Sequence, residues 1–314
     1  VSKTAYPVNP VKTPLKNYNH KGDFTVMTIG TGCPDTIVGR SGPCTMVQYK
    51  GKYFLVDIGA GTTFRIVEAG IPLGSIDNIF ITHMHTDHTD GYIKFMIESW
   101  GQGRRETDIY GVEGVEALHN IIPTVFSEDI RYRMGKTRTT DGISTKVNIT
   151  ELKGDNTFEV DGVKVSTTPT IHAVYNLAYR FDADGKSIVV SGDTSYNKNL
   201  IRLSRDADVF VVDVGRVVNR SYLGPGSMNM PGGKGSSSQS APLIPAIYMP
   251  AEVKNKSHGT LEDVAYMAKK ANVKKTVLTH YPPFEVDEEA TLRQFKRLYD
   301  GEVVLGQDQL EIQP

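Results

Sequence analysis

The sequence has little cysteine, no excess of either charge and no long apolar run. Its two cysteines, Cys33 and Cys44, form no repeated metal-binding spacing; they permit a disulfide, but isolated buried thiols are favoured. Thirty-five Lys and Arg against 36 Asp and Glu leave a net charge of -1, so the chain lacks the overall positive field that attracts nucleic acid. No apolar run approaches the roughly 20 residues that a bilayer span needs.

The length of 314 residues suits one large domain or two small ones, and we expect one. A polar, proline-containing tail covers residues 1–21, the domain covers 22–314, and a loop is inserted at about 215–256. The start at Val1 predicts a processed precursor or a trimmed chain, which favours a secreted or periplasmic protein, with a cytoplasmic one as the alternative. The sequence leaves open whether the protein is a homodimer.

Histidine, by contrast, is concentrated in one stretch that follows the apolar run 79–81. His83, His85, Asp87 and His88 lie within six positions, a density that folding alone does not require. Imidazole and carboxylate are ligands that zinc and similar cations prefer. On extended backbone, side chains two apart point the same way, so His83 and His85 can bind one ion. Asp87 and His88 fall in the turn that follows and can bind a second ion.

The rest of the chain alternates short apolar strands with helices. The strands are predicted at 24–30, 43–49, 53–58, 79–82, 107–111, 147–152, 157–160, 163–168, 177–182, 187–191, 209–213, 276–279, 302–305 and 309–313. The helices are predicted at 63–70, 91–99, 113–122, 260–270 and 287–299. A second sheet begins among the strands after 147. Residues 123–146 are predicted to be irregular. The loop 215–256 is predicted to be a lid, a pocket wall or a disordered segment. The basic residues 104–105 and 131–138 are predicted to be solvated.

Four further polar residues follow predicted strands or precede a helix. They are His172, Asp193, His258 and His280. Loops at strand ends are where α/β scaffolds place their chemistry, because such loops can be shaped without disturbing the core. Each residue alone is more simply a satisfied core or cap residue, but together with the first motif they indicate one metal site.

The whole pattern resembles the metallo-β-lactamase fold superfamily, whose signature is His-x-His-x-Asp-His followed by a downstream His, Asp and His. Within it the chain is most similar to the tRNase Z and arylsulfatase-like branch. The residues that carry this similarity are Gly30-Thr31-Gly32, Arg40, Gly42-Pro43, His258-Gly259-Thr260 and Leu278-Thr279-His280. The resemblance implies an α/β (α+β) fold, a four-layer αββα sandwich with the metals at one edge between two sheets.

The resemblance also implies a ligand set for two divalent cations, most readily zinc, with manganese or iron as alternatives. One ion would be held by His83, His85 and His172, the other by Asp87, His88 and His280, with Asp193 bridging them. Asp57 matches a position that orients a ligand histidine by a hydrogen bond.

Asp87, His258 and Asp213 are the candidate residues for the chemistry itself. His258 matches a histidine that assists phosphodiester cleavage by stabilising developing charge or protonating the leaving oxygen. The branch normally has a His-Glu pair where this chain has Val212-Asp213, so Asp213 is the residue left to orient His258.

The leading hypothesis is a metal-dependent hydrolase that cleaves small phosphate diesters or sulfate esters by attack of a metal-bridging hydroxide. A β-lactamase or lactonase acting on a cyclic carbonyl substrate is the alternative, and a binding protein on a decayed hydrolase fold is a third reading. A tRNase Z-type endoribonuclease is disfavoured, because the short gap between His172 and Asp193 holds no basic arm for tRNA. The expected partner is therefore a small molecule, with neither nucleic acid nor a membrane.

Overall fold

The computed structural model describes residues 22–36, 38–136, 139–219, 257–282 and 285–314. The tail 1–21 and the loop residues 220–256, including any lid, lie outside the described residues. The division into a tail and one domain therefore stays a prediction. None of the described helices is long and apolar enough to span a membrane.

The first sheet contains the N-terminal strands and one strand from the C-terminus. Among the described residues its strands run in the order β14-β1-β2-β3-β4-β5-β6. Their bounds are β1 Phe24–Gly30, β2 Cys44–Tyr49, β3 Lys52–Val56, β4 Asn78–Ile81, β5 Thr107–Gly111, β6 Val147–Glu151 and β14 Leu310–Ile312. Pairing is antiparallel from β14 to β3 and parallel from β3 to β6.

The second sheet begins as an antiparallel meander and ends as a parallel array. In the described part of the chain its strand order is β13-β12-β11-β10-β9-β8-β7. Their bounds are β7 Asn156–Val160, β8 Val163–Thr170, β9 Asn176–Ala183, β10 Lys186–Val190, β11 Val209–Asp213, β12 Lys275–Thr279 and β13 Glu302–Leu305. Since β8 is antiparallel to β9 and β9 to β10, the carboxyl ends of β8, β10, β11 and β12 meet at one edge.

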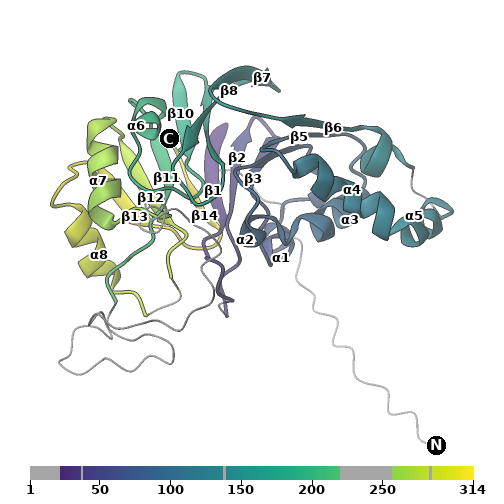
Figure 1. The fold of residues 1–314 in the computed structure, drawn as a ribbon, viewed down its shortest axis with the longest axis horizontal. Helices are drawn as coiled ribbons and strands as arrows, with labels where there is room; N and C mark the ends of the chain where they lie inside the picture. Colours follow the sequence, from purple (N-terminus) through teal and green to yellow (C-terminus); the bar gives the residue numbers. More distant parts are fainter. Residues whose placement is uncertain (1–21, 37, 137–138, 220–256, 283–284) are drawn as a thin grey trace, which may run out of the picture.

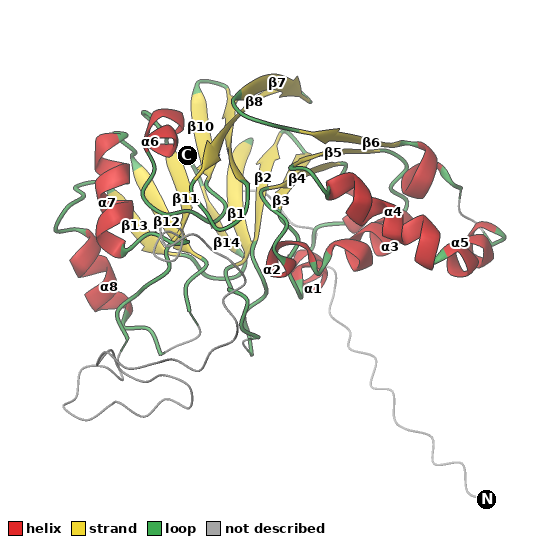
Figure 2. Cartoon of the chain, in the orientation of Figure 1, coloured by secondary structure: helices red, strands yellow, loops and turns green. Residues whose placement is uncertain are grey.

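Helices cover the outer face of each sheet, which gives the expected four layers (Figure 1; Figure 2). Beside the first sheet lie α1 Thr62–Glu68, α2 Thr86–Thr89, α3 Tyr92–Gly101, α4 Val115–Val125 and α5 Ser127–Met134. Beside the second lie α6 Lys198–Leu203, α7 Leu261–Lys270 and α8 Glu288–Phe295. A 3-10 turn at Leu73–Ser75 and a π turn at Asp141–Thr145 complete the helical elements of the described residues.

The alternation of side chains along each strand explains the packing between layers. On β4, Phe80 packs in the core between the two sheets, whereas Ile79 and Ile81 pack under the helices of the first sheet. The ring centroids of Phe80 and Phe181 lie 5.2 Å apart in an edge-on arrangement, so aromatic rings join the sheets. The sandwich thereby holds the ends of β4 and the second-sheet strands in fixed positions.

Most predicted elements are confirmed, but the structure corrects several. Residues 123–146 are not irregular, because they contain α5 and the π turn; only Ile130 of α5 is buried, so the helix has no apolar stripe to reveal it. Helix α6 was also missed, because its six residues are too few to show a helical period. The second sheet begins at β7, because β6 pairs with β5 of the first sheet.

One residue predicted to be solvated and one histidine outside the ligand motifs are buried. Arg104 is only 1% exposed and donates hydrogen bonds to Ser99 Oγ and the Met96 carbonyl oxygen at the end of α3. His119, left over from the ligand motifs, is 4% exposed and hydrogen-bonded to the Tyr92 hydroxyl. Both cysteines are free thiols, with Cys44 buried and Cys33 half-buried.

Candidate metal centre

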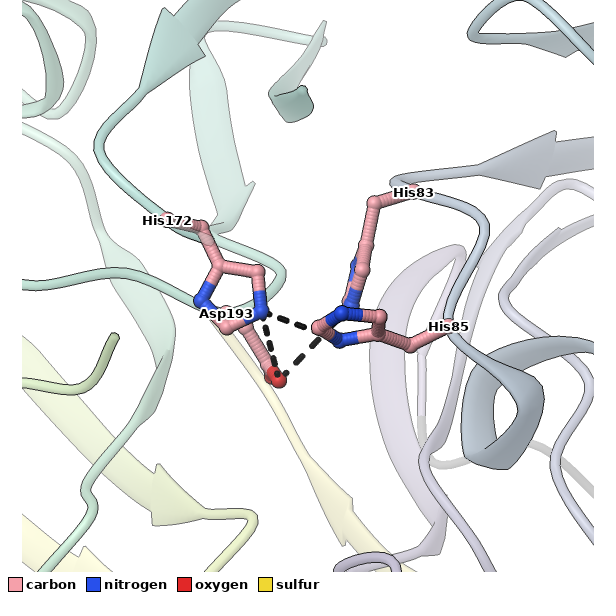
Figure 3. A group of neighbouring side chains, drawn as sticks. All are labelled: His83, His85, His172 and Asp193. Atoms are coloured by element: carbon pink, nitrogen blue, oxygen red, sulfur yellow. Dashed lines mark hydrogen bonds and ion pairs between the residues drawn. The ribbon is translucent and has the colours of Figure 1, made fainter. Parts of the chain in front are cut away.

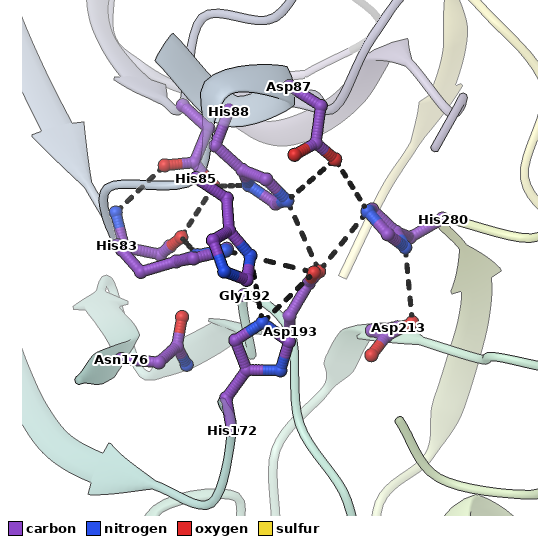
Figure 4. A network of polar contacts seen from close by, with 12 residues as sticks. His83, His85, Asp87, His88, His172, Asn176, Gly192, Asp193, Asp213 and His280 are labelled. Atoms are coloured by element: carbon purple, nitrogen blue, oxygen red, sulfur yellow. Dashed lines mark hydrogen bonds and ion pairs between the residues drawn. The ribbon is translucent and has the colours of Figure 1, made fainter. Parts of the chain in front are cut away.

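The seven predicted metal ligands converge at one edge of the sandwich, between the two sheets (Figure 4). The loop after β4 brings His83 and His85, and the single turn α2 brings Asp87 and His88. The ends of β8, β10 and β12 bring the other three, which are His172, Asp193 and His280. Asp87 and His88 thus lie in a short helix rather than in the turn that the sequence predicted.

The first cluster consists of His83, His85, His172 and Asp193 (Figure 3). The closest ligand atoms are His172 Nε2 and His85 Nδ1, which lie 3.1 Å apart. Asp193 Oδ2 is 3.8 Å from His83 Nε2 and 3.7 Å from His172 Nε2. Three ring nitrogens and one carboxylate oxygen therefore surround a common point.

The second cluster joins Asp87, His88 and His280, and it shares Asp193 with the first (Figure 4). Asp87 Oδ2 lies 3.2 Å from His280 Nε2 and 3.5 Å from His88 Nε2. Asp193 Oδ1 lies 3.3 Å from His88 Nε2 and 3.4 Å from His280 Nε2. Because Oδ1 faces this cluster and Oδ2 faces the other, Asp193 is placed to bridge two ions.

Both clusters fit divalent cations. With zinc–nitrogen bonds of about 2.0–2.1 Å, two tetrahedral ligands lie about 3.3 Å apart, close to most of the separations above. Three buried atoms that face these clusters have no hydrogen-bond partner among the described residues, namely His83 Nε2, His88 Nε2 and Asp193 Oδ1. Buried polar atoms are rarely left unpaired, so these three favour a cation. The donor set is compatible with a dinuclear metal site and does not distinguish zinc from manganese or iron.

Asp57 orients the first motif from behind, as the sequence predicted. Its carboxylate lies 2.8 Å from His88 Nδ1 and accepts hydrogen bonds from the Thr82 N–H and the Thr82 hydroxyl at 2.8 and 2.7 Å. Asp57 has a positive φ of 59° and its N–H donates to the Phe80 carbonyl oxygen, so the β3–β4 pairing fixes its position. The Asp57–His88 contact leaves His88 Nε2 to face the cluster.

Other histidines are oriented by contacts that the sequence did not predict. His83 Nδ1 lies 3.0 Å from the Thr82 hydroxyl, and His172 Nδ1 lies 2.7 Å from the Ser257 carbonyl oxygen. In both cases the second ring nitrogen faces Asp193. Thr82 adjoins the motif and could have been suggested by position, but a backbone carbonyl such as that of Ser257 leaves no signal in the sequence.

His258 lies beside the clusters with Asp213 behind it. Asp213 Oδ2 is 2.8 Å from His258 Nδ1, while Oδ1 is 3.4 Å from Nδ1 of His280. The His258 ring centroid lies 5.3 Å from those of both His172 and His280. Asp213 is buried and also accepts a hydrogen bond from the Thr194 N–H at 3.0 Å. The shorter Asp side chain therefore still reaches His258.

The pKa values of these histidines differ because their neighbours differ. Burial lowers the pKa of His83, and the nearby ring of His88 adds to that effect. Burial also acts to lower the pKa of His88, but the carboxylates of Asp193 and Asp57 outweigh it and raise that pKa to about 10. Burial also acts to lower the pKa of His258, but the hydrogen bond to Asp213 outweighs it, so this pKa lies above the ordinary value. A proton on His258 is thus favoured, as an acid requires.

Comparison with known proteins supports the predicted fold. Residues 24–219 match a family described as Anti-Pycsar protein Apyc1, a range that ends before His258 and His280. A ribonuclease Z from Mycobacterium sp. (strain KMS) is 28% identical over 298 residues, which covers 92% of this chain and 96% of that protein.

Two solved structures show the same architecture. The metallo-β-lactamase fold protein YhfI from Bacillus subtilis superposes with a TM-score of 0.67 at 18% identity, covering 93% of this chain and 100% of that one. A diphosphatase from the PhnP family gives a TM-score of 0.59 at 21% identity, covering 93% and 98% respectively. The resemblance predicted from the ligand motif, including the similarity to tRNase Z, is confirmed.

Proposed function

The chain belongs to the Anti-Pycsar protein Apyc1 family and is a metal-dependent hydrolase of the metallo-β-lactamase fold, and from this premise we propose that it hydrolyses small phosphate diesters or sulfate esters. The observation that carries the proposal is the pair of clusters that share Asp193, with His258 held beside them by Asp213. The names of its relatives, a ribonuclease Z and a diphosphatase, support the phosphate class.

Two divalent cations would be held by the seven ligands, one by His83, His85 and His172 and the other by Asp87, His88 and His280, with Asp193 shared. Two such ions, when bound, activate a water molecule as the nucleophile and offset the negative charge of the phosphoryl oxygens. The histidines must be neutral at the ligating nitrogen, and the contacts of Asp57, Thr82 and Ser257 with the opposite nitrogens orient them for this.

His258 is the residue placed to protonate the leaving-group oxygen. Because Asp213 contacts Nδ1, the other nitrogen, Nε2, carries the proton that can be donated. The His258 side chain is 33% exposed, so a proton given to the leaving oxygen can be replaced from solvent. Asp213 acts as a positioning residue, since it aligns His258 and contacts His280 without facing the substrate.

A ribonuclease activity is the second candidate, favoured by the relatives named ribonuclease Z over nearly the whole chain. The segment between His172 and Asp193 argues against it, because β9, a tight turn and β10 fill this segment. The net charge of -1 also provides no general attraction for RNA. Lactone or β-lactam hydrolysis would use the same metals but has less need of His258.

The test is a turnover panel on the metal-loaded protein, covering aryl phosphodiesters, aryl sulfates, a lactone, a β-lactam and a precursor tRNA. We expect the phosphodiesters or the sulfates to be cleaved, and His258→Ala to reduce kcat by about 10²–10⁴-fold, the usual contribution of a general acid. The loss should be greater for methyl phenyl phosphate than for methyl 4-nitrophenyl phosphate, because the poorer leaving group depends more on the acid.

Asp213→Asn serves as the matched variant, since it keeps the shape of the side chain and removes the charge behind His258. It should show a smaller loss with the same dependence on the leaving group. Metal content and melting temperature of each variant establish that the fold and the ions are retained. Absence of turnover on every phosphodiester and sulfate, with lactone or β-lactam cleavage that survives His258→Ala, would contradict the proposal.

A further inference from the structure

An apolar cavity lies at the same edge of the sandwich as the metal centre and has no part in the chemistry described so far. It has a volume of about 390 Å³, within the range of small-molecule pockets. Its lining consists of Met84, Val112, Glu113, Lys153, Val174 and Tyr175. These residues come from the loops after β4, β5, β6 and β8, so the cavity lies at the same edge of the sandwich as the ligands.

The segments that carry the metal ligands also form this cavity. Met84 stands between His83 and His85, and Val174 and Tyr175 follow His172 by two and three positions. His85 and His172 contact each other directly, with ring nitrogens 3.1 Å apart. Three of the six lining residues therefore lie within three positions of a ligand of the first cluster, the one formed with His83 and Asp193.

The loop after β8 exposes apolar surface at the cavity. Val174 and Tyr175 are 39% and 46% exposed. The Tyr175 hydroxyl accepts a hydrogen bond of 2.7 Å from the Gly154 N–H, which fixes the ring against the opposite wall. An anchored aromatic ring that remains open to solvent provides a surface for another ring.

The charged residues of the lining do not offer a site for a charged group. Glu113 and Lys153 form an ion pair of 2.9 Å with each other, and both side chains are about three-quarters exposed. Their charges are satisfied at the solvent side, which leaves Met84, Val112, Val174 and Tyr175 as the contact surface. Thioether and tyrosine groups favour aromatic partners.

We propose that this cavity is a specificity subsite that receives an apolar or aromatic ring, carried as one organic substituent of the ester whose cleavage is proposed above. The inference rests on the proposed function for the ester class. The enzyme would then prefer substrates that carry a ring next to the phosphoryl group, and Tyr175 and Val174 would determine this preference.

The test compares two substrates that share a leaving group, 4-nitrophenyl phenyl phosphate and methyl 4-nitrophenyl phosphate. Burial of the extra ring should raise kcat/KM for the phenyl diester about tenfold or more over the methyl diester. Tyr175→Ala and Val174→Ser should each reduce this ratio to about threefold or less, with the methyl diester changed less than about twofold. Tyr175→Phe retains the ring and should retain the ratio.

Tyr132→Ala, which removes an exposed tyrosine from the distant helix α5, is the control and should leave both rates unchanged. A wild-type ratio near one, or equal losses on both diesters in Tyr175→Ala, would refute the subsite while leaving the proposed function intact.

Binding provides a readout that does not depend on turnover. Calorimetric titration of the metal-loaded protein should show tighter binding of phenylphosphonate than of methylphosphonate, with the difference reduced in Tyr175→Ala but not in Tyr132→Ala. If neither diester is cleaved but this binding preference is found, the ester hydrolase proposal fails and the ring subsite stands. Equal binding of the two phosphonates contradicts the subsite whatever the activity.

Discussion

Asp57 shows how a single carboxylate determines the geometry of the metal centre. It accepts hydrogen bonds from both the N–H and the hydroxyl of Thr82 and contacts His88 Nδ1, whereas an amide side chain has one acceptor oxygen. We expect Asp57→Asn to weaken metal binding about 10–100-fold, the usual effect of losing an outer-shell partner. Metal titration by competition with a chromophoric chelator measures this.

Asp184→Asn is the matched control for that change. Asp57 and Asp184 both have a positive φ, 59° and 48°, a conformation that asparagine also adopts readily. The Asp184 carboxylate, however, contacts the exposed Lys50 in a hairpin turn. Metal affinity should be unchanged in Asp184→Asn. An unchanged affinity in Asp57→Asn would mean that the histidine orientation is set elsewhere.

Asp208 gives a pH dependence that is independent of the metal centre. Burial acts to raise its pKa, but hydrogen bonds from Lys274 Nζ at 2.6 Å and the Ser187 N–H at 2.8 Å outweigh this and lower the pKa below its ordinary value. A lowered folded-state pKa stabilises the fold above the unfolded-state pKa, about 4, and the stabilisation is lost as pH falls through the folded-state value.

Asp208→Asn should therefore lower the free energy of unfolding by about 1–2 kcal/mol at pH 7, and this difference should shrink below about pH 4. Urea denaturation across the pH range measures it. Asp300→Asn, which alters an exposed contact with Lys269, should cause no measurable change. A difference that does not vary with pH would show that ionisation of Asp208 is not responsible.

The sequence indicated the metal-ligand residues better than it indicated which other polar residues are buried. Histidine and aspartate after apolar strands restrict the chemistry sharply, and the structure brings all seven together. Arg104 was misjudged because burial of a polar residue depends on distant partners. His119 is buried through Tyr92 and the Ile143 carbonyl oxygen, neither of which its own neighbourhood in the sequence indicates.

Among the elements, helix α7 tests how local capping supports the site. The Thr260 hydroxyl accepts a hydrogen bond from the Asp263 N–H, and the Asp263 carboxylate accepts one from the Thr260 N–H, which forms a capping box. The cap follows His258 by two residues. Thr260→Ala should lower the free energy of unfolding by about 1 kcal/mol. Denaturation curves measure this change.

Thr260→Ser retains the hydroxyl and should remain near the wild-type stability. If both variants lose the same free energy, packing of the threonine methyl group, rather than capping, is the cause. The metal content should be unchanged in both, because neither side chain contacts a ligand histidine.

Elements were predictable where hydrophobic periodicity or capping marks them and not where they are exposed. Helix α7 buries Leu261, Val264 and Ala265 and carries a cap, so its start was predicted to within one residue. Helix α5 is stabilised instead by exposed contacts such as Arg133 with Asp129, which favour a helix without producing an apolar stripe. Hydrophobic periodicity therefore does not predict such helices.

For the whole molecule, the order of strands could be predicted only through the resemblance to a known fold. Local patterns gave most strands within two residues, yet they did not place β14 beside β1 or β6 beside β5. Those pairings join segments far apart in the sequence, and they depend on which apolar faces meet in the sandwich. The apolar cavity beside Met84 was not predicted either, since four separate loops form it.

Because the two sheets carry different ligands, the cations should stabilise the molecule as a whole. His83, His85, Asp87 and His88 come from the first sheet, and the other three ligands from the second. Ions that bind only the folded state add about 2.7 kcal/mol to the free energy of unfolding when free metal is 100 times the dissociation constant.

We expect EDTA to lower the melting temperature by several degrees, and zinc to restore it with an end point at two equivalents. The apo protein should stay folded, because the aromatic core between the sheets does not involve the metals. An end point at one equivalent, or a melting temperature that does not respond to metal, would contradict a dinuclear centre that joins the sheets.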